Sequence, residues 1–168
     1  LINEFFDITR FSLTHLELEK GDTDLKRMLE QMCSEFGPGL AQRGMTCQLD
    51  LPGELRAVCD SDKIARVFDN LLNNACHYAY SDSVLRVAAR AEETKIVMTF
   101  CNAGPTIPPE KLARMFEQFF RLDTSRGTRT GNAGLGLAIA KEIVEAHGGT
   151  ITARSGGEEM LFTVTLPR

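Results

Sequence analysis

The 168-residue sequence lacks the marks of several specialised protein classes. No apolar run approaches the roughly 20 residues of a transmembrane helix, and no signal peptide is recognisable, so we expect a soluble cytoplasmic chain. The net charge is −4 and no dense Lys/Arg patch is present, which gives no argument for nucleic-acid binding. The five cysteines include no C-x-x-C pair, which predicts reduced thiols and argues against a disulfide framework or a zinc site.

What the chain does contain is typical of one globular domain. Its length suffices for a single hydrophobic core, and its 43% hydrophobic and 25% charged residues are ordinary for a soluble protein. In the first 20 positions, apolar residues such as Leu1, Phe5 and Ile8 recur at helical spacing with no capping residue before them. This segment is either the end of a longer helix that pairs with a partner helix or a helix docked on its own domain, and we expect Gly21 to end it.

Helix and strand signals alternate along the rest of the chain. Asp22 or Thr23 can cap a helix that runs to about Phe36, where a Gly-Pro-Gly segment breaks or bends it, and Asp60 or Ser61 can cap the next helix. The order of elements predicts a two-layer α/β sandwich with helices on one face of a mixed sheet. The other expected elements are strands at 45–51 and 55–59 joined by a Pro-Gly turn, a helix at 60–79, strands at 84–92, 95–101, 150–155 and 160–166, and a helix at 134–147.

The helix expected at 60–79 carries amide side chains beside its apolar stripe. Asn70 and Asn74 are four residues apart and therefore project from the same face. We expect Asn73 to be solvated. Asn74 lies closer to the apolar residues, where an amide oxygen can ligate a hard cation such as Mg²⁺.

Two loop segments combine turn residues with groups that can bind a ligand. Asn102 follows a strand, so its amide either caps the turn or contacts the edge of a ligand. Gly131, Gly134 and Gly136 precede or open the helix at 134–147, although glycine destabilises a helix. These glycines indicate either a tightly packed turn or a main chain that approaches an anion at the helix N-terminus.

These segments occur in an order that resembles one known family. An Asn-rich helix, Asn-x-Gly at a strand end, the aromatic run MFEQFFR, the glycine-rich helix start and His-Gly-Gly together resemble, over roughly 22–168, the catalytic and ATP-binding domain of bacterial sensor histidine kinases. That family belongs to the GHKL superfamily, and the resemblance implies its Bergerat-type fold, with ATP and Mg²⁺ as ligands. Residues 1–21 are similar to the end of the dimerisation and histidine-phosphotransfer helix with its linker, and the sequence is similar to sensors of the vancomycin-resistance type.

The resemblance assigns roles to residues of the base and metal sites. Asn74 matches the asparagine that ligates Mg²⁺, and Tyr78 matches an aromatic residue near the nucleotide. Asn102 replaces the aspartate that accepts a hydrogen bond from the adenine amino group, which weakens that bond but keeps an acceptor. His77 stands where a lysine usually contacts phosphate, and a neutral imidazole is a weaker partner. The same site includes Gly104, Thr106 in place of a second glycine, and Ile107 as an apolar wall for the purine.

The resemblance also implies a polar lid over the nucleotide, between the aromatic run and the last helix. Phe116 and Phe119 are expected in the core at the base of the lid, and Arg121 and Arg126 are candidates for phosphate contacts. The glycines at the helix start would let main-chain amides approach the triphosphate. The remaining ATP-binding residues that the resemblance implies are Phe120, Gly131, Gly134, Leu135, Gly136 and Leu137.

Two features concern the reaction. In ATP-hydrolysing relatives a glutamate four residues before the Mg²⁺ asparagine acts as general base; here that position is Asn70, and Asp69 points about 100° away around the helix. Phosphoryl transfer to a neutral imidazole needs little help from a base, so the sequence favours a histidine kinase over an ATPase. The acceptor-histidine motif surrounds none of the three histidines, so we expect the acceptor to lie outside these residues.

The resemblance further implies partners and a location. It implies a homodimer through the protein's own dimerisation and histidine-phosphotransfer domain, a response regulator as partner, and a place on the cytoplasmic face of the bacterial inner membrane, reached through other segments. Two other functions stay open. One is a nucleotide-binding regulatory module without transfer activity, which His77 and Asn102 favour, and the other is a GHKL ATPase.

Overall fold

The main sheet of the protein has five strands. The computed structural model describes residues 17–120 and 135–168, and within them the strands lie in the order β2-β4-β5-β7-β6. β2 pairs in parallel with β4, and the other neighbours pair antiparallel. The predicted mixed sheet is therefore confirmed. Its strands are β2 (Thr46–Asp50), β4 (Val84–Ala91), β5 (Lys95–Ala103), β6 (Thr150–Gly156) and β7 (Glu159–Pro167).

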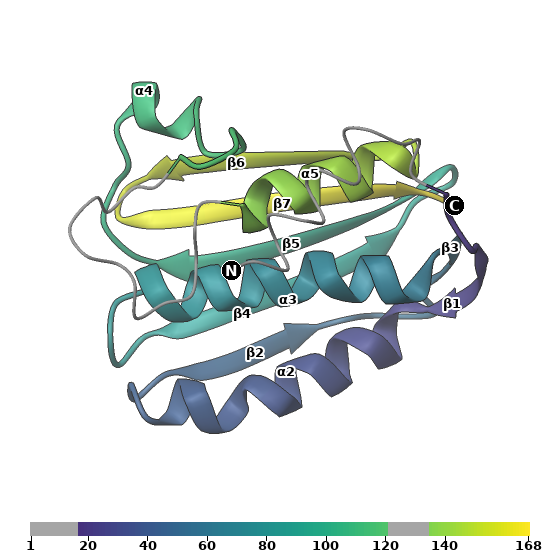
Figure 1. Ribbon diagram of the computed structural model, residues 1–168. Coiled ribbons are helices and arrows are strands. Elements are labelled where there is room, and N and C mark those ends of the chain that lie inside the picture. Colours follow the sequence, from purple (N-terminus) through teal and green to yellow (C-terminus); the bar gives the residue numbers. More distant parts are fainter. Residues whose placement is uncertain (1–16, 121–134) are drawn as a thin grey trace.

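Helices cover one face of this sheet (Figure 1). α2 (Leu25–Ala41), α3 (Ser61–Tyr78) and α5 (Gly136–Ala146) lie side by side across it, and α3 contacts both of the others. The short α4 (Pro109–Leu112) lies at one end, near β6. This arrangement confirms the predicted two-layer α/β sandwich. Among the helices of the described residues, none has an apolar stretch long enough to cross a membrane.

The core lies between the helices and the sheet. On β5 the side chains of Ile96, Met98 and Phe100 are buried, and they point to one face because a strand alternates its side chains. Phe68 of α3 meets them, with its ring centroid 5.7 Å from that of Phe100. Burying a large apolar side chain of this kind contributes about 1.5–3 kcal/mol. The core therefore fixes α3 on the sheet.

The last four residues of the helix predicted for the start of the chain are not helical. Residues 17–20 have no regular secondary structure, and β1 (Gly21–Asp24) pairs antiparallel with β3 (Arg56–Cys59) in a separate two-stranded sheet. The Pro-Gly turn therefore does not join β2 to a neighbouring strand. The part of the predicted helix that covers residues 1–16 lies outside the described residues.

Aspartates cap both long helices. α2 is capped by Asp24, whose side chain accepts a hydrogen bond of 3.1 Å from a first-turn N–H. The predicted caps Asp22 and Thr23 lie in β1, so that prediction was wrong. α3 is capped by Asp60, as predicted, which accepts a hydrogen bond of 3.2 Å from the N–H of Lys63.

α2 also runs further than the sequence predicts. It continues through Pro38 to Ala41 and does not end near Phe36. Proline inside a helix removes one main-chain hydrogen bond. The last turn is held by Leu40, which is buried in the core and offsets part of that loss.

Candidate functional site

A cavity of about 280 Å³ lies where the C-terminal end of α3, the end of β5 and the loop before α4 meet. Its wall comes from three separate segments of the chain, which are α3, residues 102–111 and, through Met160, β7. Six of the residues predicted to bind ATP line this cavity. They are Asn74, Tyr78, Asn102, Gly104, Thr106 and Ile107.

Asn74 and Tyr78 reach the cavity from consecutive turns of α3. Asn74 is 7% exposed, and among residues 17–120 and 135–168 its side chain has no hydrogen-bond partner. Leaving a buried amide unsatisfied costs about 1–3 kcal/mol, which a ligand or ion at this position would recover. An amide oxygen in such a place suits a hard cation such as Mg²⁺.

Asn70 lies one turn earlier on α3 and does not line the cavity. Its Nδ2 atom donates a hydrogen bond of 2.9 Å to the carbonyl oxygen of Gly136, the first residue of α5. Among the residues that the structure describes, no side chain caps α5 at Leu135, so the first N–H groups of the helix and the positive end of its dipole can meet an anion. A Cβ at Gly136 would lie 3.6 Å from Asn70, an ordinary contact, so packing against α3 does not require glycine there.

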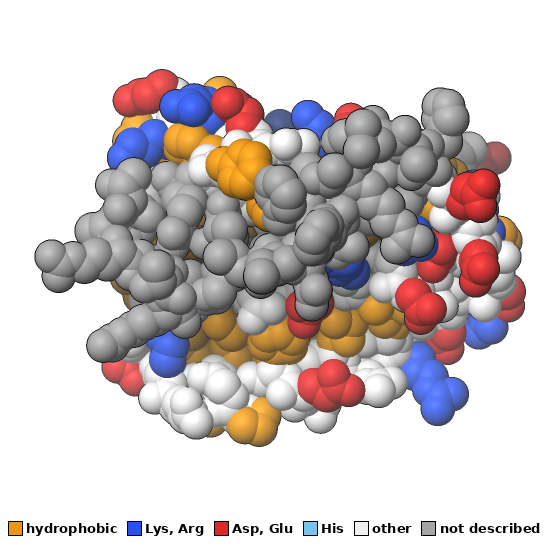
Figure 2. All heavy atoms as spheres, viewed as in Figure 1, with side chains coloured by type: hydrophobic (Ala, Val, Ile, Leu, Met, Phe, Trp, Pro, Cys, Tyr) orange, Lys and Arg blue, Asp and Glu red, His pale blue; other side chains and the backbone are white. Residues whose placement is uncertain are grey.

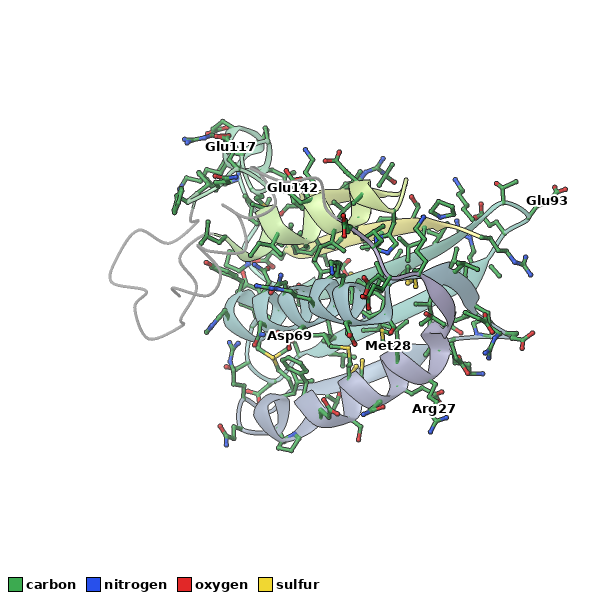
Figure 3. All side chains as sticks on the ribbon, turned by 45° about the vertical axis from the view of Figure 1, so that its right-hand side comes forward. Arg27, Met28, Asp69, Glu93, Glu117 and Glu142 are labelled. Carbon is green, nitrogen blue, oxygen red and sulfur yellow. The ribbon has the colours of Figure 1, made fainter. Side chains whose placement is uncertain are left out.

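Asp69, the carboxylate next to Asn70, lies on the side of α3 that faces α2 (Figure 3). Its Oδ2 atom accepts a hydrogen bond of 3.2 Å from Nδ2 of Asn73. Burial raises the pKa of Asp69, and Glu35 adds to this effect while Arg66 and the bond from Asn73 oppose it. Asp69 does not line the cavity, which agrees with its expected unsuitability as a general base.

Asn102, at the end of β5, is the second buried amide of the cavity and is 3% exposed. Its Nδ2 atom donates a hydrogen bond of 3.3 Å to the carbonyl oxygen of Ala103, which orients the amide. Within the described ranges no donor contacts its Oδ1 atom. This oxygen is therefore left as an acceptor, and it suits a ligand that donates from an amino group.

The loop between β5 and α4 is hydrogen-bonded to the end of β6 and to the turn that follows it. The N–H of Gly104 donates to the carbonyl oxygen of Glu158 at 2.9 Å, and the N–H of Glu158 donates to Oγ1 of Thr106 at 3.0 Å. The N–H of Ile107 donates to Oγ of Ser155 at 2.8 Å. Three hydrogen bonds thus hold one wall of the cavity in place.

Gly104 is required because this loop passes close to α3. A Cβ at this position would lie 2.8 Å from the carbonyl oxygen of Tyr78 and 3.3 Å from Nδ2 of Asn102. The first of these distances is shorter than side chains tolerate against main-chain atoms. Gly104 therefore has a steric role in addition to its place in the cavity wall.

Other predicted site residues lie outside the cavity wall. His77 is exposed on α3, and Phe120 is half-buried beneath the Arg114 guanidinium, which lies 4.7 Å from its ring centroid. Leu135 is buried and Leu137 is half-buried, and both pack on the core at the start of α5. Four further predictions, Arg121, Arg126, Gly131 and Gly134, fall outside the described residues.

The two phenylalanines expected in the core differ from each other. Phe116 is half-buried, and its ring meets Phe162 edge to face with centroids 6.3 Å apart. Phe119 is 55% exposed, so its predicted place in the core was wrong. The main chain at Phe119 has a φ of 66°, and this left-handed turn directs the side chain away from the core.

Sequence reasoning missed part of the cavity wall. Pro105 and Pro108 lie in the same irregular segment as the predicted residues Gly104, Thr106 and Ile107. Their place in the cavity wall could therefore have been predicted from their neighbours. Met160 has the pattern of a core strand residue, and Lys111 that of a surface residue, so neither could be distinguished from the sequence. Figure 2 shows Lys and Arg side chains over α4, the element that contains Lys111.

Comparison with known proteins gives one matching family and several relatives. Residues 59–168 match the family described as histidine kinase-, DNA gyrase B-, and HSP90-like ATPase. The sensor protein VanSC of Enterococcus gallinarum is 49% identical over the whole chain. The chain covers 46% of VanSC, so it spans about half the length of this relative.

Solved structures share the fold. The Acinetobacter baumannii histidine kinase AdeS aligns with a TM-score of 0.83 at 24% identity, over 99% of this chain and 76% of AdeS. A complex of the histidine kinase ThkA with the response regulator protein TrrA contains a chain that aligns with a TM-score of 0.81 at 22% identity, over 98% of this chain and 46% of that one. Both alignments cover nearly the whole chain and therefore include both layers of the sandwich.

Proposed function

The chain belongs to the histidine kinase-, DNA gyrase B-, and HSP90-like ATPase family, and we propose that it is the catalytic ATP-binding domain of a bacterial sensor histidine kinase in a two-component system. One observation carries the proposal. Two buried amides, Asn74 and Asn102, line one cavity, and within residues 17–120 and 135–168 the atoms that a Mg·ATP complex would contact have no hydrogen-bond partner. The similarity to VanSC supports the kinase branch of the family.

The base of the nucleotide binds at Asn102. Because its Nδ2 is engaged by Ala103, the amide offers Oδ1 as an acceptor, which suits the amino group of adenine. Ile107 and Met160 supply apolar surface for the purine faces. The hydrogen bonds between this loop and Ser155 and Glu158 hold the wall in place before the ligand binds.

Asn74 and the start of α5 would hold the phosphates. Asn74 would hold Mg²⁺ through its amide oxygen, and the ion would supply neutralisation of the phosphate charge. The uncapped N–H groups of α5 would contact phosphate oxygens, with Asn70 fixing the first turn of that helix against α3. The contacts predicted for His77, Arg121, Arg126, Gly131 and Gly134 remain part of this proposal.

The reaction is transfer of the γ-phosphate to a histidine outside these residues. A ring nitrogen of that histidine forms the new N–P bond, the bond between the γ-phosphorus and its bridging oxygen breaks, and ADP leaves. Asn70 cannot accept a proton, and a neutral imidazole does not need one removed before it attacks. An amide at this position therefore suits transfer to histidine better than hydrolysis by water.

The proposal also covers the domain organisation, the oligomeric state, the location and the partner of the full protein. Residues 1–21 belong to the end of the dimerisation and histidine-phosphotransfer domain with its linker, and 22–168 form the catalytic domain. The full protein is a homodimer at the cytoplasmic face of the inner membrane and passes its phosphate to a response regulator. The complex of ThkA with the response regulator TrrA supports this partnership.

A nucleotide-binding regulatory module without transfer activity is the second candidate. His77 is exposed and lies outside the cavity wall, so its contact with a phosphate group would be weaker than that of the lysine it replaces. This position favours the regulatory module. A GHKL ATPase is the third candidate. Incubation with γ-labelled ATP and a separate dimeric acceptor domain distinguishes them.

We expect label on the acceptor domain, acid-labile and alkali-stable, with no stable label on this chain and very slow hydrolysis by the chain alone. Label is expected to accumulate slowly, because a separate acceptor lacks the effective concentration of a tethered one. Nucleotide binding without any labelling would support the regulatory module, and rapid hydrolysis would support the ATPase.

Calorimetry on two matched variants tests the metal position. Asn74→Ala should weaken Mg·ATP binding at least about tenfold, because a charge-assisted contact is worth roughly 1.5–3 kcal/mol. Asn73→Ala removes an exposed amide of the same helix and should leave binding within about twofold. Circular dichroism of both variants shows whether the fold is intact, and equal losses from the two variants would contradict the assignment.

A further inference from the structure

A buried group of hydrogen bonds joins three segments at the far end of α3 and α5 from the cavity. The segments are residues 17–20, the start of α3 at Asp60, and the end of α5 at His147. Asp60 is 4% exposed and His147 is 5% exposed. Neither residue has a part in the nucleotide site, so their burial needs another explanation.

The imidazole of His147 is bonded through both nitrogens. Nε2 accepts a hydrogen bond of 3.0 Å from the N–H of Asp60, so Nδ1 carries the proton and donates to the carbonyl oxygen of Ile143 at 2.8 Å. Only the neutral ring with its proton on Nδ1 satisfies both contacts. A second proton on Nε2 would face the Asp60 N–H, and that bond would be lost.

The carboxylate of Asp60 fastens the entering segment. Its Oδ2 atom accepts a hydrogen bond of 2.9 Å from the N–H of Glu19, and its Oδ1 atom accepts one of 3.2 Å from the N–H of Lys63. The ammonium of Lys63 lies 3.4 Å from Oδ2. Asp60 thus holds α5 through its main chain and residues 17–20 through its side chain.

The two helices are also joined at a second point, where Asn70 in the middle of α3 donates to the carbonyl oxygen of Gly136 at the start of α5. α3 and α5 are therefore joined at two points, once one turn from Asn74 and once at Asp60 and His147. Two such junctions on packed helices give a continuous physical connection between the two regions.

We propose that Asp60 and His147 are positioning residues that couple the segment at residues 17–20 to the nucleotide site, and that a neutral His147 ring is required for the coupling. Its relevance to signalling rests on the function proposed above, in which this segment leads to the domain that carries the acceptor histidine. Nucleotide binding then stabilises the attachment of Glu19, and by linkage the attachment of Glu19 favours nucleotide binding.

The charges around His147 set the range in which the coupling fails. Burial lowers the pKa of His147, Lys20 and Lys63 lower it further, and the Ile143 carbonyl and Asp60 oppose them. The pKa therefore lies below the ordinary value of 6.5. The hydrogen bond from the Glu19 N–H to Asp60 is therefore kept at neutral pH. It is lost as the pH falls through the lowered pKa of His147.

Amide exchange in the 168-residue chain, followed by NMR, tests the proposal. The protection factor of the Glu19 N–H should rise when ADP is added at pH 7.5, and without ADP it should fall at least about tenfold as the His147 ring gains its second proton. Asp60→Asn keeps a capping oxygen for Lys63 but removes the charge, so it should lower the Glu19 protection factor at every pH.

Two results would overturn the coupling. One is an unchanged Glu19 protection factor in a wild-type chain that binds ADP, which leaves the proposed function intact. The other is protonation of His147 without any response at Glu19. Failure of the wild-type chain to bind ADP would instead contradict the proposed function, and the coupling with it.

Discussion

The side-chain Nδ2 of Asn70 donates a hydrogen bond of 2.9 Å to the carbonyl oxygen of Gly136 and thereby joins the middle of α3 to the first turn of α5. The same contact explains why an amide occupies this position. An amide can donate to a carbonyl oxygen, whereas a carboxylate would repel it. Under the function proposed above, we therefore expect Asn70 to act on the nucleotide through α5, as a positioning residue.

Two variants of Asn70 test this role. Asn70→Ala and Asn70→Asp both lose the donor, so both should weaken ADP binding by roughly 5- to 20-fold, and Asp should be no better than Ala. Calorimetry at constant pH measures the affinities, and Asn73→Ala serves as the control on the same helix. Unchanged ADP affinity in Asn70→Asp, together with faster ATP hydrolysis, would show that the position acts as a base site instead.

Asn102 is expected to act on the base of the nucleotide and not on its phosphates. Asn102→Ala should therefore reduce the affinities for ATP and ADP by the same factor, about 5- to 10-fold for one neutral hydrogen bond in a buried site. Competition binding with both nucleotides measures the two factors side by side. A loss confined to ATP would contradict the assignment, because only the γ-phosphate distinguishes these ligands.

Thr106 shows how a departure from the family pattern can be explained by a contact. Its hydroxyl accepts the hydrogen bond from the Glu158 N–H, a partner 52 residues away. Thr106→Val keeps the shape but removes the acceptor, and should weaken ADP binding about 3- to 10-fold, while Thr106→Ser should retain most of the affinity. Equal affinities of the two variants would show that the hydroxyl does not hold the loop.

The sequence allowed the fold class, the family and six residues of the cavity wall to be predicted. Asn74 could be found because it lies four residues from Asn70 and beside the apolar residues of its helix, and Asn102 because it ends a strand close to glycine and proline, whereas Tyr78 came from the resemblance to the family. These signals are local, and local signals can be read from one sequence.

The errors came from contacts between distant segments. Asp22 and Thr23 do not cap α2 because they lie in β1, which pairs with β3. α2 continues past its predicted end because Leu40 is buried in the core. The hydrogen bond from Ile107 to Ser155 joins residues 48 positions apart, so it cannot be predicted from the pattern of either segment. Tertiary packing overrides propensity in such cases.

The pH dependence of stability follows from the buried His147. Its folded pKa lies below the ordinary value of 6.5, mainly because burial disfavours the charged ring. Between these two values the unfolded chain binds more protons than the folded one, so the free energy of unfolding falls as the pH falls. The contribution of His147 is therefore complete above pH 6.5 and is lost progressively below it, with a slope of at most about 1.4 kcal/mol per pH unit.

The control is His147→Gln, which cannot titrate in this range but offers an amide oxygen to the Asp60 N–H. Urea unfolding of both proteins between pH 7.5 and pH 5 should show a decline in the wild type that is absent or much smaller in the variant. Asp60 does not contribute to the pH dependence between pH 7.5 and pH 5. Burial raises the pKa of its carboxyl, but the hydrogen bonds from Glu19 and Lys63 outweigh this effect and hold the pKa below 3.8. The stability that Asp60 contributes is therefore lost only in stronger acid. An identical decline in both proteins would assign the pH dependence to other groups and remove His147 from the explanation.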